Sequence, residues 1–399
     1  MADLIATIKT KAQKLLPELI RCRRYLHAHP ELSFHEQETA QYLKNYLTQK
    51  QITWRSCGQN GILATLPGHT PAARSILLRA DIDALPILEK NQLDYASTRP
   101  GVMHACGHDG HTAMLLGVIS LLTELHDVYS GTVHCIFQPA EEKIPGGALE
   151  MIADGVLADP HLELVLGQHV MPSLTVGQVA MRPGLFTASA DEVVITVRGK
   201  GGHAAQPHTV IDPLLIAAHL LVALQQFVSR QANPATPSVL SFGRCVAEGA
   251  INVIPDEVRL EGTFRTLDES WRKRAHEQIR TLAEQLALGM GGSCTVDIRR
   301  GYPSIINDQN VYDQIKGYAQ TYLGAEQVLI TDPWMAAEDF AYYTQQKPGL
   351  FYLLGSGNAA KGITSALHTA TFNLDEDALA IGTGLMTFCA MKMLGVEGI

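Results

Sequence analysis

Residues 103–125 read MHACGHDGHTAMLLGVISLLTEL, a glycine-rich turn that leads into a long apolar segment. Only Gly107 separates Cys106 from His108, and the residues that follow have the length and composition of a buried helix. The turn therefore stands at a predicted helix entrance, where backbone N–H groups and the helix dipole favour a deprotonated cysteine. A thiolate beside an imidazole suits zinc or a similar divalent metal, and the plain alternative is a turn whose histidines only satisfy backbone groups.

Short apolar runs on both sides of this segment predict buried strands. They lie at residues 61–66, 75–79, 132–138 and 162–167. Helical patterns separate several of them, notably at 112–125 and 147–154, and further helices are predicted at 2–26 and 34–50. This alternation predicts an α/β fold, a covered mixed sheet with helices on its faces.

The pattern changes between residues 188 and 300. Strands are predicted at 191–198, 238–247, 256–266 and 293–299, with helices at 212–230 and 268–289. Their order, β-α-β-β-α-β, is typical of a ferredoxin-like α+β unit. Helical patterns then return near 308–323 and 376–394. We therefore expect a discontinuous large domain, residues 1–187 and 301–399, with an inserted domain at 188–300.

Composition excludes several classes of protein. The chain has 399 residues, a formal net charge of -9 and no cluster of basic residues, which argues against nucleic-acid binding. No apolar run reaches the roughly 18 residues of a membrane span, and the N-terminus lacks the features of a signal peptide. The seven cysteines are widely spaced and odd in number, so we expect no disulfide framework and a cytoplasmic location.

Acidic side chains follow two of the predicted strands. Glu141 and Glu142 come after the strand at 132–138 and point in different directions, so one can bind a metal while the other accepts a proton. Asp81 and Asp83 follow the strand at 75–79 and could bind a metal or orient an imidazole. A solvated acidic turn and a capped turn are the respective alternatives.

Two further histidines also follow apolar segments. His169 comes after the strand at 162–167, and His368 lies in the segment ALHTATF. A lone histidine in such a place is more often a core or rim residue than a ligand. Together with Cys106, His108 and Glu142, however, they provide enough ligands for two metals if one residue bridges them, and Glu141 remains free as a base.

Eight motifs carry a resemblance to a known family. They are RADIDALP (79–86), HACGHDGHTA (104–113), FQPAEE (137–142), GQHV (167–170), GKGGHAA (199–205), NVIPD (252–256), AEDF (337–340) and LHTA (367–370). In this order, across nearly the whole chain, they resemble the M20 metallopeptidase family. The resemblance is greatest to the branch of hippurate hydrolases, auxin-amino-acid conjugate hydrolases and N-acyl-amino-acid amidohydrolases. It implies a dinuclear-metal catalytic domain with an inserted α+β lid or dimerisation domain.

The resemblance also implies roles for individual residues. Cys106 would bridge two divalent metal ions, with His108, Glu142, His169 and His368 completing the ligand shell and Glu141 as general base. Zinc, manganese, nickel or cobalt would suit these donors. Much of the wider family has a histidine ligand two residues before the Asp83 position; here Asp81 stands in its place, so Asp81 remains an open ligand and Asp83 is expected to orient a ligand.

Three residues of the inserted domain are candidates for substrate binding. The resemblance implies that His203, Asn252 and Arg265 contact the substrate carboxylate or the oxyanion of the transition state. Arginine can clamp a carboxylate through two hydrogen bonds, and a histidine on a glycine-rich turn can reach an oxyanion. Taken alone, Arg265 is a strand surface residue and His203 a turn residue. We expect a homodimer through the inserted domain, and His203 could act in either its own subunit or the neighbouring one.

The expected function is metal-dependent hydrolysis of the amide bond of N-acyl amino acids, such as hippurate-like or N-acetyl conjugates. The metals would polarise the carbonyl and acidify a water, Glu141 would transfer the proton, and the inserted domain would close over the substrate. A dipeptidase or aminopeptidase of the same family is the first alternative. A non-catalytic metal-binding protein of the same fold is the second, and the intact Glu141 beside a full ligand set argues against it.

Overall fold

The computed structural model describes residues 2–70 and 74–396, which form two compact units. The large unit comprises Met1–Phe186, Ile305–Asp332 and Asp339–Ile399. The small unit comprises Thr187–Ser304 and Pro333–Glu338. The small unit is thus inserted in the sequence of the large one, and a short later segment packs with it.

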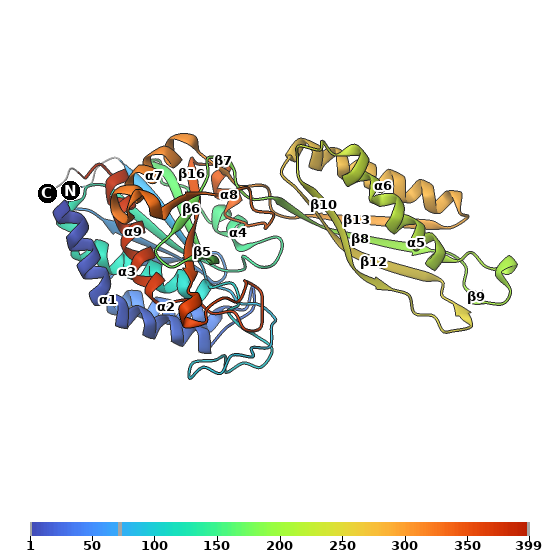
Figure 1. The fold of residues 1–399 in the computed structure, drawn as a ribbon, viewed down its shortest axis with the longest axis horizontal. Helices are drawn as coiled ribbons and strands as arrows, with labels where there is room; N and C mark the ends of the chain where they lie inside the picture. The colour runs from blue at the N-terminus through green and yellow to red at the C-terminus, as the bar shows by residue number, and fades with distance from the viewer. Residues whose placement is uncertain (1, 71–73, 397–399) are drawn as a thin grey trace. The chain divides into compact units, whose positions relative to one another are not determined.

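A mixed sheet forms the centre of the large unit (Figure 1). Its strand order is β1-β2-β4-β3-β5-β16-β6-β15. The four middle strands β4, β3, β5 and β16 run parallel, whereas β1, β2 and β6 pair antiparallel with their inner neighbours. The strands are β1 (Thr53–Cys57), β2 (Gly61–Pro67), β3 (Ser75–Asp81), β4 (Thr132–Gln138), β5 (Leu162–Thr175), β6 (Val179–Met181), β15 (Val328–Ile330) and β16 (Gly349–Gly357). The predicted α/β class with a mixed sheet is confirmed.

Helices cover this sheet and bury its middle strands. Every residue of β3 and of β16 is buried, as expected for parallel strands with helices on both faces. The helices of the large unit are α1 (Ala2–Ala28), α2 (Gln37–Gln49), α3 (His108–Glu124), α4 (Gly147–Ala153), α7 (Gln309–Leu323), α8 (Ala341–Thr344) and α9 (Asp377–Met393). Helices α1, α3 and α9 pack against one another (Figure 1).

Helix α3 begins earlier than its apolar pattern predicted. The pattern starts at Thr112, but the helix starts at His108, and its first turn includes the buried Asp109 and His111. These polar residues make buried hydrogen bonds, so they interrupt the apolar signal without interrupting the helix. His108 therefore lies in the first turn of a rigid helix.

The small unit has the predicted β-α-β-β-α-β order. Its antiparallel sheet has the strand order β10-β12-β8-β13. The elements are β8 (Ser189–Arg198), α5 (Pro213–Leu224), β10 (Ser238–Val246), β12 (Glu257–Thr266), α6 (Glu269–Gly289) and β13 (Ser293–Arg300). Asp212 and Asp268 cap the N-termini of α5 and α6 by accepting backbone hydrogen bonds. Alternate residues of β8, including Val193, Ile195 and Val197, point into the core under these helices.

Two short strand pairs complete the described structure. In the small unit, β9 (Gly202–His203) pairs antiparallel with β11 (Val253–Ile254) and forms a projecting tip. In the large unit, β7 (Gly184–Leu185) pairs with β14 (Ile306–Asn307), next to two of the four places where the chain passes between the units.

Helix α5 is apolar on both of its faces. Ile216 and Leu220 are buried in the core of the small unit, whereas Leu215 and Val222 are 52% and 76% exposed. By length and composition, Pro213–Gln231 is the one helical segment of the described residues that could cross a membrane, although the sequence predicted none. A third of its most apolar window, 33%, is buried inside the small unit. Exposure of the remaining apolar face to water is energetically unfavourable.

Candidate metal centre and active site

The ends of the parallel strands bring most of the candidate residues together. Asp81 ends β3, Glu141 lies three residues beyond the end of β4, and His169 lies in β5. Cys106 precedes α3, and His368 lies between β16 and α9. The carboxyl edge of an open α/β sheet is where such folds place their ligand sites.

Five side chains form what we call the donor cluster: Cys106, His108, Glu142, His169 and His368. The Cys106 Sγ atom lies 3.2 Å from His169 Nε2 and 3.3 Å from His368 Nε2. His368 Nε2 lies 3.2 Å from Glu142 Oε1.

Cys106 belongs to two sets of three donors. The ligand atoms of Cys106, His108 and His169 all lie within 4.8 Å of one another, and so do those of Cys106, Glu142 and His368. One thiolate shared by two such sets is what a bridged pair of metal ions requires.

Glu141 stands beside the cluster but outside both sets that contain Cys106. It forms a third close group with His108 and Glu142, and its Oε2 lies 3.9 Å from His108 Nε2. The side chain of Glu141 is 8% exposed, so the carboxylate itself is largely shielded from bulk water. Within this pair, Glu142 is thus the potential metal ligand and Glu141 the potential base.

The pKa shifts within the cluster indicate a site that is suited to bind positive charge. Burial and the carboxylates of Glu142 and Glu141 raise the pKa of the Cys106 thiol well above its usual range. The sequence predicted the opposite, because a helix entrance favours a thiolate; here burial and two acidic neighbours outweigh the helix dipole. A thiolate at this position therefore needs a cation beside it.

His108 leads to the same conclusion. Burial acts to lower its pKa, but the charge of Asp81 and the hydrogen bond to Asp83 outweigh burial and raise it to about 10. Its Nε2 atom is buried and has no hydrogen-bond partner among the residues that the structure describes. A buried imidazole nitrogen surrounded by acids is a fitting ligand for a divalent cation, which would replace the proton.

Asp83 orients two members of the cluster. Its Oδ1 lies 3.2 Å from His108 Nδ1, which leaves Nε2 directed at the cluster. Its Oδ2 accepts hydrogen bonds from Ser33 Oγ at 2.7 Å and from the backbone N–H of Glu142 at 3.0 Å. A carboxylate that fixes the ring of a ligand histidine is a recurrent part of metal sites.

Asp81 has both carboxylate oxygens engaged. Oδ1 lies 2.6 Å from His111 Nδ1, and Oδ2 accepts a hydrogen bond from Arg79. His111 Nε2 in turn accepts the backbone N–H of Val170 at 2.8 Å, so the proton of this ring sits on Nδ1. These contacts favour a positioning role for Asp81, because they tie α3 to β5 beside His169.

Sequence reasoning assigned no role to His111 or Arg79. His111 lies three residues after His108, on the same side of α3, and an earlier predicted helix start would have revealed this spacing. Arg79 also donates to Asp339 Oδ1 at 3.0 Å, 260 positions along the chain, and nothing in the local sequence indicates this contact.

The turn that carries the cluster requires glycine at one position. Gly107 has a φ of 89°, and a Cβ atom there would lie 2.3 Å from Val170 Cγ2. Any side chain there would strain the backbone and displace Val170, the neighbour of His169 in β5.

The structure separates the three candidate residues of the small unit. His203 lies in β9 opposite Val253 of β11, and the N–H of Ala204 donates to the carbonyl of Asn252 at 3.0 Å. His203 and Asn252 are thus neighbours on the exposed tip. Arg265 lies eight positions beyond Glu257 at the other end of β12, a distance of roughly 27 Å along the strand.

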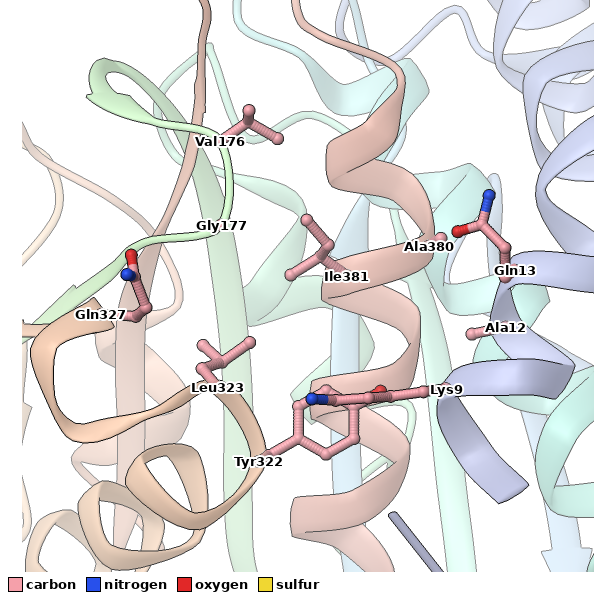
Figure 2. Close-up of a pocket in the computed structure, with 10 residues that line it drawn as sticks. All are labelled: Lys9, Ala12, Gln13, Val176, Gly177, Tyr322, Leu323, Gln327, Ala380 and Ile381. Atoms are coloured by element: carbon pink, nitrogen blue, oxygen red, sulfur yellow. The ribbon is translucent and has the colours of Figure 1, made fainter. Parts of the chain in front are cut away.

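A pocket in the large unit lies apart from the donor cluster. A pocket of about 510 Å³ lies beside α1, α7, α9 and the turn at Val176–Gly177 (Figure 2). The Nζ atom of Lys9 lies 5.0 Å from the centre of the Tyr322 ring at its rim. None of the residues that line it belongs to the donor cluster.

Comparisons with known proteins agree with this geometry. Residues 77–392 match the family model described as Peptidase family M20/M25/M40. The chain is 38% identical over 378 residues to N-acetyl-L-cysteine deacetylase of Bacillus subtilis, covering 94% of this chain and 88% of that protein. It is 40% identical over 301 residues to N-acyl-L-amino acid amidohydrolase of Geobacillus stearothermophilus, covering 75% of this chain and 80% of that protein.

One solved structure shares the fold, and its description mentions the binding of two metal ions. The YXEP protein of Bacillus subtilis, described as a dinuclear metal-binding peptidase of the M20 family, matches with a TM-score of 0.81 at 35% identity. The match covers 96% of this chain and 100% of that chain. The extent of these matches confirms the resemblance seen in the motifs, and the chain belongs to peptidase family M20/M25/M40.

Proposed function

We propose that this enzyme hydrolyses the amide bond of N-acyl amino acids to a carboxylic acid and a free amino acid. The observation that carries the proposal is the pair of donor sets that share Cys106, with Glu141 beside them and outside both. The names of two relatives, an N-acetyl-L-cysteine deacetylase and an N-acyl-L-amino acid amidohydrolase, support this substrate class.

The residues of the large unit divide the work of amide hydrolysis. Cys106, His108, Glu142, His169 and His368 would hold two divalent cations, which would polarise the carbonyl and acidify a water molecule. Glu141 accepts a proton from that water as the water oxygen attacks the carbonyl carbon. The C–N bond then breaks, and Glu141 returns the proton to the leaving nitrogen.

The donor cluster also limits the choice of metal. One thiolate, three imidazoles and one carboxylate suit zinc, cobalt, nickel or manganese, whereas magnesium and calcium prefer all-oxygen sites. We propose two such ions per subunit. Elemental analysis of the purified protein tests this stoichiometry.

The small unit is proposed to bind the substrate and to form a homodimer. His203 and Asn252 on the tip are too far along the small unit from Arg265 for all three to contact one small substrate within a single subunit. If all three act on the same substrate, the tip and Arg265 come from different subunits. The exposed apolar residues of α5 give the small unit a surface that a second copy could cover.

Closure of the small unit over the substrate would exclude water from the reaction. Arg265 would clamp the substrate carboxylate, and His203 would donate to the oxyanion. We also propose a cytoplasmic location, which is supported by seven free cysteines among the described residues. Fractionation of the source cells tests the location.

A comparison of two substrate series tests the proposed activity. The metal-loaded enzyme is assayed with N-acetyl- and N-benzoyl-amino acids and with free dipeptides of the same C-terminal residues. We expect kcat/KM to be at least about tenfold higher for the N-acyl series, because a free amine needs an acidic partner. Faster hydrolysis of free dipeptides would establish the alternative, a dipeptidase, and no turnover of either series would contradict both.

A further inference from the structure

Glu36 is a buried acidic side chain that belongs neither to the donor cluster nor to the glutamate pair. It directly precedes α2 and is fully buried. Oε1 accepts hydrogen bonds from the backbone N–H groups of Phe34 at 2.9 Å and of Ala140 at 2.8 Å. Oε2 accepts from Asn60 Nδ2 at 2.9 Å. Burial and the charge of Asp83 raise the pKa of Glu36 to about 7, so placing a carboxyl group here is costly.

Both backbone donors belong to residues in the left-handed conformation. Phe34 has a φ of 69° and Ala140 a φ of 55°. Neither is glycine, and a residue with a Cβ atom keeps this conformation only when its surroundings hold it in place. A single carboxylate oxygen thus accepts hydrogen bonds from two turns with strained backbone conformations.

These two turns lead to the residues of the reaction. Ala140 directly precedes Glu141 and Glu142, so its backbone angles set the direction in which both side chains leave the chain. Next to Phe34, Ser33 donates to Asp83 Oδ2, the same oxygen that accepts the N–H of Glu142. Both turns therefore converge on the glutamate pair.

We propose that Glu36 is a positioning residue, which holds Ala140 in the left-handed conformation and thereby aims Glu141 at the substrate and Glu142 at the metal. It acts through the backbone and is not itself a ligand or a base. This inference rests on the roles proposed for Glu141 and Glu142. Because Oε1 accepts the hydrogen bond from the backbone N–H of Ala140, the length of the side chain matters more than its charge.

Two substitutions at this position separate reach from charge. Glu36→Gln keeps the length and an acceptor oxygen, and the amide of Asn60 can turn to accept from the new NH₂ group. Glu36→Asp keeps the charge but withdraws the oxygen by one methylene. Asn60→Ala is the matched control, since it removes the partner of Oε2 in the same buried region without touching Ala140.

Each variant is measured at saturating metal, with circular dichroism to confirm folding. We expect Glu36→Asp to lower kcat by about tenfold or more with KM within about threefold of the wild type. Glu36→Gln and Asn60→Ala should stay within about threefold in both parameters. Equal losses in Glu36→Gln and Glu36→Asp, or no loss in either, would overturn the proposal.

Glycine at position 140 provides a second test. Glycine adopts positive φ without strain, so Ala140→Gly should reduce the need for Glu36. We expect Glu36→Asp/Ala140→Gly to recover at least about half of the lost kcat on a logarithmic scale. A double variant that is no faster than Glu36→Asp would show that Glu36 does not act through Ala140.

A readout without substrate separates this inference from the proposed activity. Competition with a metallochromic chelator gives the affinity of the apoprotein for Co²⁺. Because Ala140 also directs Glu142, Glu36→Asp should weaken the more weakly held ion by about tenfold, whereas Glu36→Gln should not. If the wild type hydrolyses no N-acyl amino acid, this contrast still holds when Glu36 positions the pair, and equal Co²⁺ affinity in all variants overturns it.

Discussion

The donor cluster and the tip of the small unit differ in burial and in the number of contacts that fix their side chains. Cys106, His108 and His169 of the cluster are buried, whereas the side chain of His368 is 52% exposed, and Asp83 fixes the orientation of the His108 ring. His203 and Asn252 are exposed on a two-stranded projection. The comparison teaches that the orientation of the donor cluster is fixed by contacts within the large unit, whereas the tip has few side-chain contacts of its own. Substitutions in the two regions should therefore fail in different ways.

The largest expected effect lies within the glutamate pair. Glu141→Gln should keep both metal ions and lower kcat by about 100- to 10,000-fold, because only the proton transfer is lost. Glu142→Gln should instead release metal, because it removes a donor. Metal analysis and steady-state kinetics of the two variants check the assignment, and equal metal loss in both would show that the pair is assigned wrongly.

His203 tests the exposed region. His203→Ala should lower kcat by about 100-fold without changing the melting temperature, because an exposed turn residue contributes little to stability. If a second subunit completes the site, two inactive variants should complement each other when their subunits are mixed. A mixture of His203→Ala and Glu141→Gln subunits regains activity if His203 acts on the neighbouring site, because a mixed dimer then has one intact site.

If His203 acts within its own subunit, every site of the mixture lacks one residue and the mixture stays inactive. An unchanged kcat in His203→Ala alone would remove either catalytic role.

His111 tests how much the buried surroundings contribute. His111→Phe keeps the ring but removes the link from Asp81 to the backbone of Val170. We expect metal affinity to fall by about 10- to 100-fold, the usual cost of losing a partner that orients a ligand. His126→Ala, at an exposed histidine after the same helix, is the matched control, and equal affinity in the two variants would contradict the positioning role.

The smallest expected effect lies at the opposite end of the sheet from the donor cluster. Asp159 accepts hydrogen bonds from Ser75 Oγ at 2.6 Å and pairs with His134 Nε2 at 2.9 Å. Burial acts to raise its pKa, but these two hydrogen bonds outweigh burial and lower it to about 2 from 3.8. The ionised form thus stabilises the fold above about pH 4, and this contribution is lost as the pH falls toward 2.

Asp159→Asn should therefore lower the free energy of unfolding by about 1 kcal/mol at pH 7, after allowance for partial solvent exposure. Activity should be unchanged. Urea denaturation at pH 7 and at pH 2.5 checks the effect, and a difference between variant and wild type that does not shrink at the lower pH would contradict it.

The same contrast explains what the sequence could predict. Apolar periodicity located the four main strands and two helices of the small unit and four strands of the large sheet, because burial determines which residues are apolar, but it did not predict β1, β6, β15 or the central strand β16. Motif order led to the family, which the comparisons confirm. The contact of Arg79 with Asp339 could not be predicted, because it joins residues 260 positions apart through side chains alone. The start of α3 was missed because its first turn is polar yet buried.

The surroundings of charged groups were also beyond prediction from sequence. A helix entrance predicted a thiolate at Cys106, but the pKa of this thiol depends on burial and on carboxylates from a distant strand end. The separation of Arg265 from His203 follows from the register of β12 against β8, which the sequence pattern leaves undetermined.

Metal stoichiometry in a Cys106 variant tests the central claim most directly, because the claim is that one thiolate serves both donor sets. Cys106→Ala is purified, saturated with zinc or cobalt, dialysed and analysed for metal per subunit. Cys135→Ala, at another buried free cysteine, is the matched control and should hold two ions. The account predicts that Cys106→Ala retains less than one ion per subunit and nearly no activity; full occupancy by two ions would contradict it.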